Sequence, residues 1–549
     1  MKKNILILSI ATFTLVYSSC KIDRTPESVF SDANFWNNES DLQNAANRFY
    51  QQLPGYTVDS RSDEYVSTSP DNISNSTRGI VATSNDWNLP YQQIFVANNI
   101  LEKGVKASVA DAIKNRYFGE ARFFRAYYYF MLVEKYGDVP LVLKTLSPTD
   151  PNLTMPRSPR ETVIKAIYDD LDFAAEWLPT RAQLPNAQYG RVTKSAALAL
   201  KARVGLYEGT WLKFRSMDGW QDHLQKAVDA ATAVMGQGHT LYNNYPGMFL
   251  HEGEGPSNTE NIFVKIYGVN NANVIVSHNT SRDLENGRIA PTRNLLRMFD
   301  YSDGLPAYNT DGTPSDTKSS YYVPESDEES YNTIMDNRDP RLATAVWRAG
   351  EVNWKGPWVP ITSLGVRTGL AGKKGWNQED WAISGSATVD KPLIRYAEVL
   401  LILAEAKYEL NGSISDADLD ATINALRRRA GATVMLTNAF VTAHNLSMRE
   451  EIRRERTEEL CLEGFRYDDL IRWKTAEVVL PETIYGAKYT TSEWVGTKAS
   501  SLNLDSDNII IVEDASKRSS FNPGRDYLYP IPLNEISLSG GNVKQNPGW

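Results

Sequence analysis

Three glutamates, Glu455, Glu459 and Glu463, recur at intervals of four residues and would lie on one face of a helix. Carboxylates that face each other in pairs can act as general acid and general base, as in the hydrolysis of glycosidic bonds. However, arginines lie close in the sequence, and a guanidinium beside a carboxylate keeps it ionised. No glutamate here is therefore an obvious general acid, and the pattern predicts ion pairs between helices. The arginines concerned are Arg453, Arg454, Arg456, Arg466 and Arg472.

The sequence lacks the motifs of common hydrolases and metal enzymes, because neither His-Glu-x-x-His nor Gly-x-Ser-x-Gly occurs in it. The run Asp416-x-Asp418-x-Asp420 opens like a calcium loop, but Ala421 and Arg427 stand where that loop needs glycine and glutamate. Two cysteines and five histidines are too few for a cysteine-rich or histidine-rich metal site. We therefore predict that the protein is not an enzyme and has no catalytic residue, no metal site and no cofactor.

The 549-residue chain carries 58 Lys and Arg against 67 Asp and Glu, which gives a net charge of −9. Nucleic-acid binding depends on a basic surface, so this balance argues against a nucleic-acid partner. The chain is also rich in aromatic residues, with 28 Tyr, 17 Phe and 13 Trp. Aromatic side chains offer flat apolar faces, which suit the stacking of sugar rings.

The N-terminus has the pattern of a secretory signal. Two lysines precede a largely apolar run over residues 4–16, which is too short for a membrane span. Ser18 and Ser19 then precede Cys20, as in a bacterial lipobox, although Tyr17 stands where that motif usually has leucine. We predict a signal peptide over 1–19 and a lipidated tether over 20–34, anchored to the membrane through Cys20. The alternative is an ordinary cleaved signal with a chance cysteine.

The elements that would position these residues are mostly helices. Apolar residues at three- and four-residue spacing predict a series of helices, whose ranges are given below. A further helical pattern begins at residue 91. Between about 236 and 392 this pattern fades, and we predict an irregular subdomain with short strands. The predicted helices span 41–53, 109–136, 160–178, 193–207, 221–235, 393–410, 416–430, 447–464 and 466–474.

Sequential helix pairs with alanine at close contacts suggest degenerate tetratricopeptide-like hairpins, although no uniform 34-residue period is present. The predicted fold class is therefore mainly α, with an irregular inserted subdomain. We predict one domain over 35–549. Its helical scaffold would comprise about 41–235 and 393–474, followed by a C-terminal tail over 475–549.

Ordered motifs along the whole mature chain resemble those of one family. They are GEARFFRAYYYF (119–130), YGDVP (136–140), GRVTKSAA (190–197), NRDPRL (337–342), RYAEVLL (395–401), AEA (404–406), ERTEELCLEGFR (455–466), DLIRW (469–473), YPIP (529–532) and QNPG (545–548). Together they resemble the SusD/RagB family of nutrient-binding outer-membrane lipoproteins of Bacteroidetes.

This resemblance implies a non-enzymatic protein on the outer face of the outer membrane. Such a lipoprotein covers a SusC-like TonB-dependent transporter, captures glycans, or peptides in some members, and hands them to that channel. The resemblance further implies that Arg122, Arg125, Arg395 and Arg472 pair with carboxylates inside the helical framework.

The ligand site is predicted from loops that carry aromatic and polar residues. We predict Asn72, Arg78 and Trp87 from a first loop, and Trp354 and Trp358 from the irregular subdomain, where residues that flank a turn could present flat faces to a sugar. The alternative for each is simple packing. Two other functions remain open: a surface glycoside hydrolase, and a protein-interaction scaffold without a small ligand. The sequence does not identify the glycan.

The lipid anchor can be tested at Cys20. We expect the Cys20→Ala variant to lose palmitate labelling and to leave the membrane fraction, because the thiol that carries the lipid is absent. Labelling and cell fractionation would measure this. If the variant stayed in the membrane fraction without any partner protein present, the predicted anchor would be wrong.

Overall fold

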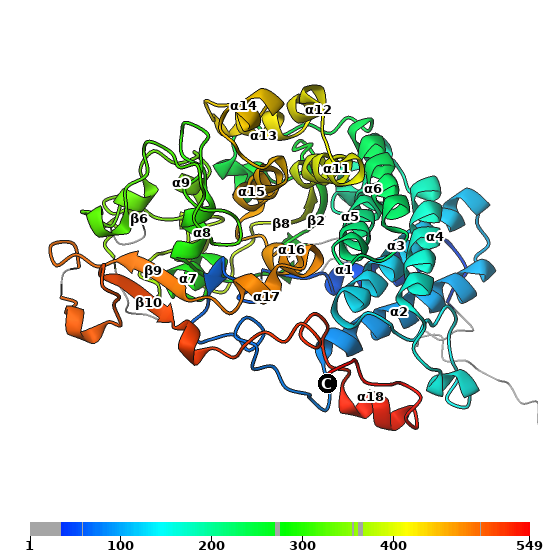
Figure 1. Cartoon of the computed structure of the whole chain (residues 1–549). Helices are drawn as coiled ribbons and strands as arrows, with labels where there is room; N and C mark the ends of the chain where they lie inside the picture. The colour runs from blue at the N-terminus through cyan, green and yellow to red at the C-terminus, as the bar shows by residue number, and fades with distance from the viewer. Residues whose placement is uncertain (1–34, 57–58, 270–274, 354–355, 361–365, 495) are drawn as a thin grey trace, which may run out of the picture.

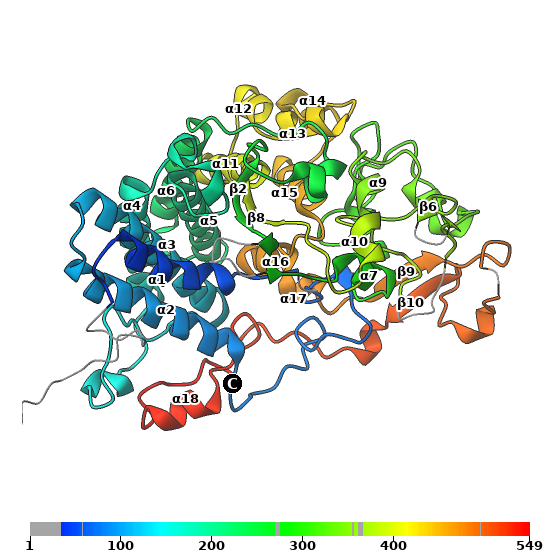
Figure 2. The same ribbon diagram turned by 180° about the vertical axis from the view of Figure 1, so that it is seen from behind.

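The computed structural model describes residues 35–56, 59–269, 275–353, 356–360, 366–494 and 496–549 (Figure 1). The predicted mainly helical fold is confirmed: long helices gather on one side of the molecule, and short elements joined by loops form the other side (Figures 1 and 2). Within the described residues, no helix has both the length and the apolar character needed to cross a membrane. Cys20 and Trp354 lie outside the described residues, so the lipid anchor at Cys20 and the ligand contact of Trp354 stay predictions.

The N-terminal helices form a stack in which consecutive members from α2 to α6 pack against each other. α5 continues to Lys213, beyond the predicted end at 207, because Gly205 and Gly209 lie at a helix contact and do not end the helix. A Cβ atom on Gly205 would lie only 2.7 Å from the backbone oxygen of His223, so glycine allows α5 and α6 to approach closely. The bounds are α1 (Glu39–Gln51), α2 (Asn85–Lys103), α3 (Asp111–Tyr136), α4 (Arg160–Trp177), α5 (Lys194–Lys213) and α6 (Trp220–Met235).

A second group of helices continues this stack. α11 packs against α5, α6 and α15, which joins the two groups into one scaffold. In Figure 1, α15 and α16 lie between the N-terminal stack and the irregular region. The bounds are α11 (Tyr396–Asn411), α12 (Asp416–Ala421), α13 (Ile423–Ala430), α14 (Asn438–Ala443), α15 (Met448–Leu460), α16 (Arg466–Trp473) and α17 (Ala476–Val479).

The prediction of a single helix over 416–430 is wrong, because the structure has two helices there, separated at Thr422. The Thr422 hydroxyl donates a hydrogen bond to the backbone oxygen of Asp418 at 2.5 Å. Threonine side chains that bond to nearby backbone in this way compete with regular helix and can bend it. The Ser415 side chain accepts a hydrogen bond from the backbone nitrogen of Asp418, so the acidic run serves as a helix start.

The segment between the two helical groups is irregular, as predicted, with short antiparallel strand pairs. β2 pairs with β8 beside the helices, and a further pair, β9 with β10, comes from the C-terminal tail. The paired strands are β1 (Tyr65–Val66) with β5 (Ala290–Pro291), β2 (Asn261–Lys265) with β8 (Lys391–Arg395), β3 (Gly268–Val269) with β4 (Ile275–Val276), β6 (Val352–Asn353) with β7 (Gly356–Pro357), and β9 (Ile484–Lys488) with β10 (Ile509–Glu513).

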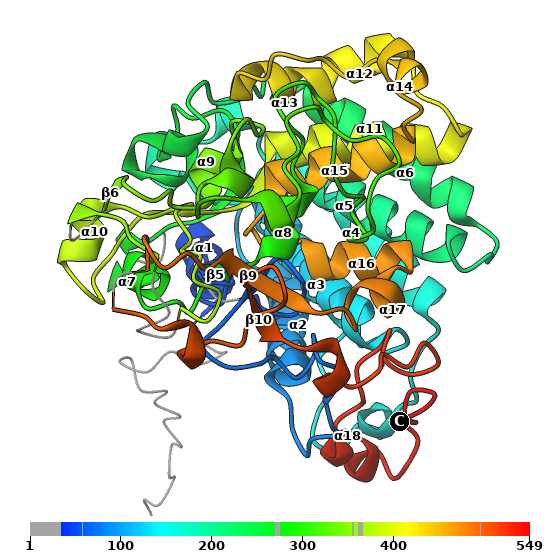
Figure 3. The ribbon, with the colours of Figure 1, turned by 60° about the vertical axis from the view of Figure 1, so that its left-hand side comes forward.

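Short helices complete the irregular region and the tail. They are α7 (Thr280–Glu285), α8 (Arg293–Met298), α9 (Leu342–Ala345), α10 (Gln378–Ala382) and α18 (Leu533–Leu538). The region has its own hydrophobic cluster, which includes Trp347, Trp358 and Trp494 and is separate from the main helical core. α18 lies beside the C-terminus at one edge of the molecule (Figure 3).

The glutamate row forms ion pairs, as predicted, but its arginine partners come from distant segments and are not the arginines nearby in the sequence, such as Arg456, which pairs with Asp469. Glu455 and Glu459 have fully buried side chains in α15, and Glu463 follows the helix, which ends at Leu460 and not at the predicted 464. Arg341 lies 2.6 Å from Glu455, and Arg395 lies 2.6 Å from Glu459. Burial alone would raise the pKa of Glu459, but the charges of three arginines hold it well below its usual value: Arg429, Arg395 and Arg341.

The arginines singled out by the family resemblance also pair with carboxylates. Arg125 forms a bidentate contact with Asp170, with both distances 2.7 Å, and Arg122 approaches the same carboxylate at 3.7 Å. Arg472 pairs with Glu405, which also accepts a hydrogen bond from the Trp473 indole at 2.7 Å. The expected structural role of these arginines is therefore confirmed.

The Glu459→Gln variant should be strongly destabilised. It leaves the charges of Arg395 and Arg429 buried without their shared carboxylate, and such a loss costs about 3–5 kcal/mol of unfolding free energy. Denaturant melts would measure it. Asp169→Asn is the matched control, because its pair with Lys165 is exposed and should cost about 0–1 kcal/mol. A fully stable Glu459→Gln protein that no longer bound its ligand would assign Glu459 to a binding site instead.

Candidate functional site

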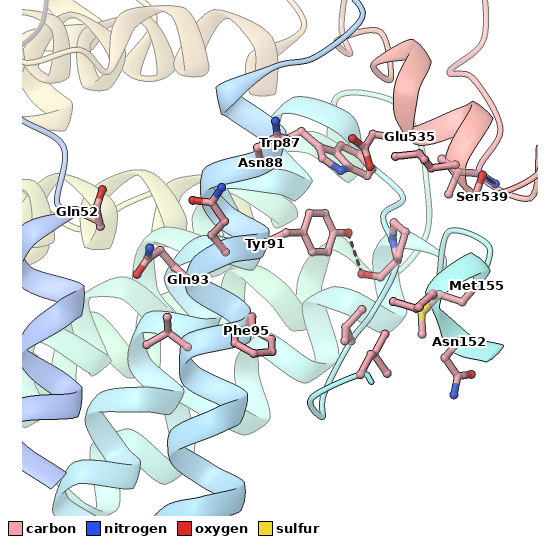
Figure 4. A pocket seen from close by; sticks show the side chains of 18 of the residues that line it. Gln52, Trp87, Asn88, Tyr91, Gln93, Phe95, Asn152, Met155, Glu535 and Ser539 are labelled. Atoms are coloured by element: carbon pink, nitrogen blue, oxygen red, sulfur yellow. Dashed lines mark hydrogen bonds between the residues drawn. The ribbon is translucent and has the colours of Figure 1, made fainter. Parts of the chain in front are cut away.

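An open groove of about 790 Å³ lies between α2, the α3–α4 connection and α18 (Figure 4). Its walls combine aromatic, aliphatic and amide side chains from these three parts of the chain, and Arg48 of α1 and Gln52 after it also line it. The lining residues used below are Arg48, Trp87, Asn88, Tyr91, Gln92, Gln93, Phe95, Asn152, Leu153, Glu535 and Leu538.

The aromatic wall of the groove comes from α2. Ser84 caps this helix by accepting a hydrogen bond from the backbone nitrogen of Asp86 at 3.2 Å. Trp87, Tyr91 and Phe95 follow at intervals of four residues and therefore share one helix face. The row runs from a buried indole, 3% exposed at Trp87, to an open phenyl ring, 53% exposed at Phe95.

Neighbouring groups hold the first two rings in place. The ring centroids of Trp87 and Tyr91 are 5.2 Å apart, and Trp87 makes an edge contact with Tyr136 at 5.0 Å. The Tyr91 hydroxyl donates a hydrogen bond to the Pro140 backbone oxygen at 2.8 Å, drawn as a dashed line in Figure 4. The start of the aromatic wall is thus rigid before any ligand arrives.

Polar groups accompany this aromatic row. Asn88, Gln92 and Asn152 contribute amides, and the Gln93 side-chain oxygen is buried without a hydrogen-bond partner among the described residues. Burial raises the pKa of Glu535, although a hydrogen bond from the Trp87 side chain opposes this shift. The groove therefore offers both donors and acceptors beside apolar faces, which is the composition of a site for a hydroxyl-rich ligand.

The structure places one predicted ligand residue, Trp87, in this groove. It lies in the first turn of α2, whereas the helical pattern was predicted to return only at residue 91. Pro90 obscures the start in the sequence, but near a helix N-terminus a proline removes few backbone hydrogen bonds. Trp87 is buried against Tyr91 and Tyr136, so only a small part of its indole lines the groove.

Among the described residues, the predicted Asn72, Arg78 and Trp358 do not line the groove. Asn72 lies exposed in a turn, and the Arg78 guanidinium sits over the Tyr529 ring, 4.0 Å from its centroid. Arg78 also donates to the backbone oxygens of Asp526 and Leu528, each at 3.3 Å, so it ties the first loop to the C-terminal tail. Trp358 directly follows β7, whose partner strand β6 lies on the other side of the molecule from α2 (Figure 1).

Trp358 does not present a flat face to solvent, contrary to the prediction. It is 4% exposed and belongs to the hydrophobic cluster of the irregular region. Its backbone nitrogen donates to the Glu351 oxygen at 2.7 Å, which fixes the chain around the β6–β7 pair. The composition around Trp358 is typical of irregular structure, as predicted. The burial of the Trp358 ring, however, depends on residues that are far away in the sequence.

Several groove residues were missed at the sequence level. The spacing of Tyr91 and Phe95 relative to Trp87 is visible in the sequence and could have identified the aromatic row. Asn152 and Glu535 carry no such signal, because only the folded chain brings the α3–α4 connection and the C-terminal tail to α2.

Two family models match this chain. The family model described as the SusD family matches residues 254–549, and a second model, "Starch-binding associating with outer membrane", matches residues 18–206. The chain belongs to the SusD family. The predicted SusD/RagB resemblance is therefore confirmed.

Similar proteins match most or all of this chain. A SusD-like protein P2 of Formosa agariphila is 24% identical, with all of both chains covered. The starch-binding protein SusD of Bacteroides thetaiotaomicron is also 24% identical, over 80% of this chain and 74% of that protein. The crystal structure of a SusD-like carbohydrate binding protein from Bacteroides fragilis superposes with a TM-score of 0.73 at 25% identity, covering 92% of this chain and 99% of that one.

The role of Trp358 can be separated from binding by substitution. We expect Trp358→Ala to lose about 3–5 kcal/mol of unfolding free energy, because the change leaves a large cavity in a buried cluster. Thermal and denaturant melts would measure it. Trp376→Ala, in the partly buried edge of the same cluster, should cost less. A Trp358→Ala protein of unchanged stability that bound a glycan less tightly would restore the original prediction.

Proposed function

We propose that this SusD-family chain is a surface glycan-binding lipoprotein. It captures oligosaccharides in the groove and delivers them to a SusC-like TonB-dependent transporter of the outer membrane. Its lipid anchor is Cys20, and no catalysis is involved. The observation that carries the proposal is the row of Trp87, Tyr91 and Phe95 beside side-chain amides.

The chemistry of this row fits a sugar chain. Pyranose rings have apolar faces that stack on aromatic side chains, while their hydroxyl groups require amide or charged partners. With a rise of about 1.5 Å per residue, Trp87 and Phe95 are about 12 Å apart along the helix axis. This length exceeds one sugar ring, so the groove suits an oligosaccharide. Arg48 and Asn152 lie where they can bind hydroxyls at the groove edges.

The names of similar proteins support the proposal. One is named a starch-binding protein and one a carbohydrate binding protein, and the family model for residues 18–206 is described as associating with the outer membrane. These roles belong to those proteins. We extend them to this chain because its groove combines aromatic and amide side chains, which suit a sugar. A peptide is the alternative ligand class within this proposal.

The carboxyl groups in the groove and in the α15 row argue against a hydrolytic function. Glycoside hydrolysis requires two carboxyl groups on either side of the scissile bond. Among the described residues that line the groove, Glu535 is the single carboxylate, and the glutamates of the α15 row are engaged in buried ion pairs. We therefore propose binding without turnover.

The aromatic row gives a direct test. We expect the double variant Tyr91→Ala, Phe95→Ala to bind its oligosaccharide about 5- to 150-fold more weakly, because each lost stacking contact is worth about 0.5–1.5 kcal/mol. Calorimetric titration across a panel of oligosaccharides, with product analysis, would measure both affinity and turnover. Phe95→Ala alone keeps the hydrogen bond of Tyr91 to Pro140 and isolates the exposed ring.

Tyr321→Ala is the matched control, since that tyrosine is exposed but lies outside the groove. Unchanged affinity in the double variant would move the glycan site elsewhere. Product formation by the wild-type protein would favour a glycoside hydrolase. Failure to bind any glycan or peptide of the panel would favour a scaffold that contacts only proteins.

A further inference from the structure

A second, smaller pocket of about 190 Å³ lies away from the groove. It is enclosed by the α4–α5 connection, which contains two short 3-10 helices, Arg181–Gln183 and Asn186–Gln188, and by the segment that leads from α6 to β2. None of its lining residues also lines the groove. It is therefore a separate candidate site.

His239 presents an unused acceptor to this pocket. The side chain is nine-tenths buried, since the residue is only 5% exposed, and its Nδ1 lies 2.7 Å from the Thr259 backbone oxygen. A carbonyl oxygen only accepts, so Nδ1 carries the proton and Nε2 is left as an acceptor. Burial lowers the pKa of His239, which favours this neutral ring. Nε2 has no hydrogen-bond partner among the described residues.

Asn261 presents a second unused acceptor. The residue is 6% exposed, and its amide nitrogen donates to the Gly253 backbone oxygen at 3.0 Å. Because that oxygen cannot donate, the orientation of the amide is fixed, with Oδ1 on the other side. Oδ1 is buried and has no partner in the described part of the chain. A buried acceptor without a donor costs free energy, so two in one pocket call for a donating occupant.

The walls and the mouth of the pocket indicate the kind of occupant. Leu184, Ile262 and Val264 supply apolar surface, while Ala182 and Asn186 lie exposed at the rim. The volume is far more than the roughly 10–15 Å³ that one water requires, and smaller than the roughly 300–1,000 Å³ of sites for drug-sized ligands. Apolar walls around two fixed acceptors match a small molecule with both C–H faces and hydroxyl groups.

We propose that this pocket binds a single neutral sugar unit, either a free monosaccharide or the end of a chain, whose hydroxyl groups donate to His239 Nε2 and Asn261 Oδ1. Arg181 and Arg191 also line the pocket, but Arg181 donates to the Pro256 backbone oxygen and Arg191 to the Glu120 carboxylate. An anion would in addition lack the donors that the two acceptors require. The site is distinct from the groove, so the proposal does not depend on the function proposed there.

The test uses D-glucose, D-galactose, D-mannose and D-xylose as probes on the purified protein, by saturation-transfer NMR and calorimetry. His239→Asn places an amide nitrogen near Nδ1, so it can still donate to the Thr259 oxygen, but it removes Nε2. We expect at least a tenfold loss of affinity for the sugar that the wild type binds. Ala182→Trp adds a large ring at the exposed rim and should abolish binding at this pocket.

Tyr321→Ala, at an exposed residue that lines neither the groove nor this pocket, is the control and should leave this binding within about twofold. If His239→Asn fails to fold, Ala182→Trp decides alone, because residue 182 is exposed. Undiminished binding in Ala182→Trp would overturn the proposal, as would a wild-type protein that binds none of the four sugars. Crystals soaked in the sugar that show only water at both acceptors would also overturn it. Loss of binding in Phe95→Ala alone would assign the monosaccharide to the groove.

Discussion

The buried ion-pair network around α15 joins the helical scaffold to the irregular region. Glu459 accepts from Arg395, at the end of β8, and from Arg341, which precedes α9. A third partner, Arg429, comes from α13. These arginines belong to three separate segments, and each is fixed by the same carboxylate. Buried charges are costly unless all are paired, so the network accepts few alternative arrangements of those segments.

The same network explains why a row of carboxylates at helical spacing is not a catalytic site. Arg341 alone contacts Asp339, Glu455 and Glu458, with distances of 2.9, 2.6 and 2.7 Å. A general acid must change its protonation state during the reaction, but the pKa of Glu459, which burial would raise, is held well below its usual value by Arg429, Arg395 and Arg341. The sequence pattern supported this interpretation because arginines of the same motif were visible nearby. It could not show that the arginines that pair with the row come from distant segments, such as Arg341 and Arg395.

Much of the scaffold could be predicted from the sequence, and much of the site could not. Helices such as α3 and α4 follow from the periodicity of apolar residues and from Gly137, which ends α3 with a positive φ of 71°. The break at Thr422 was missed because neither a proline nor a glycine marks it in the sequence. In the groove, the row on α2 has a local signal. Glu535 enters only through long-range packing, and the burial of Trp358 likewise depends on distant residues.

The C-terminal tail has a structural task that bears on how the protein is made. The Tyr529 nitrogen donates to the Lys135 oxygen at 2.7 Å, the Leu533 nitrogen donates to the Val81 oxygen at 3.0 Å, and α18 then forms one wall of the groove. A ribosome synthesises α2 more than 400 residues before α18, and domains fold as their chain emerges. The aromatic row therefore forms early, whereas the groove closes only when the tail docks. A chain that lacks its last residues keeps the aromatic row but loses the wall that α18 supplies, so the groove is complete only once the whole chain has been synthesised.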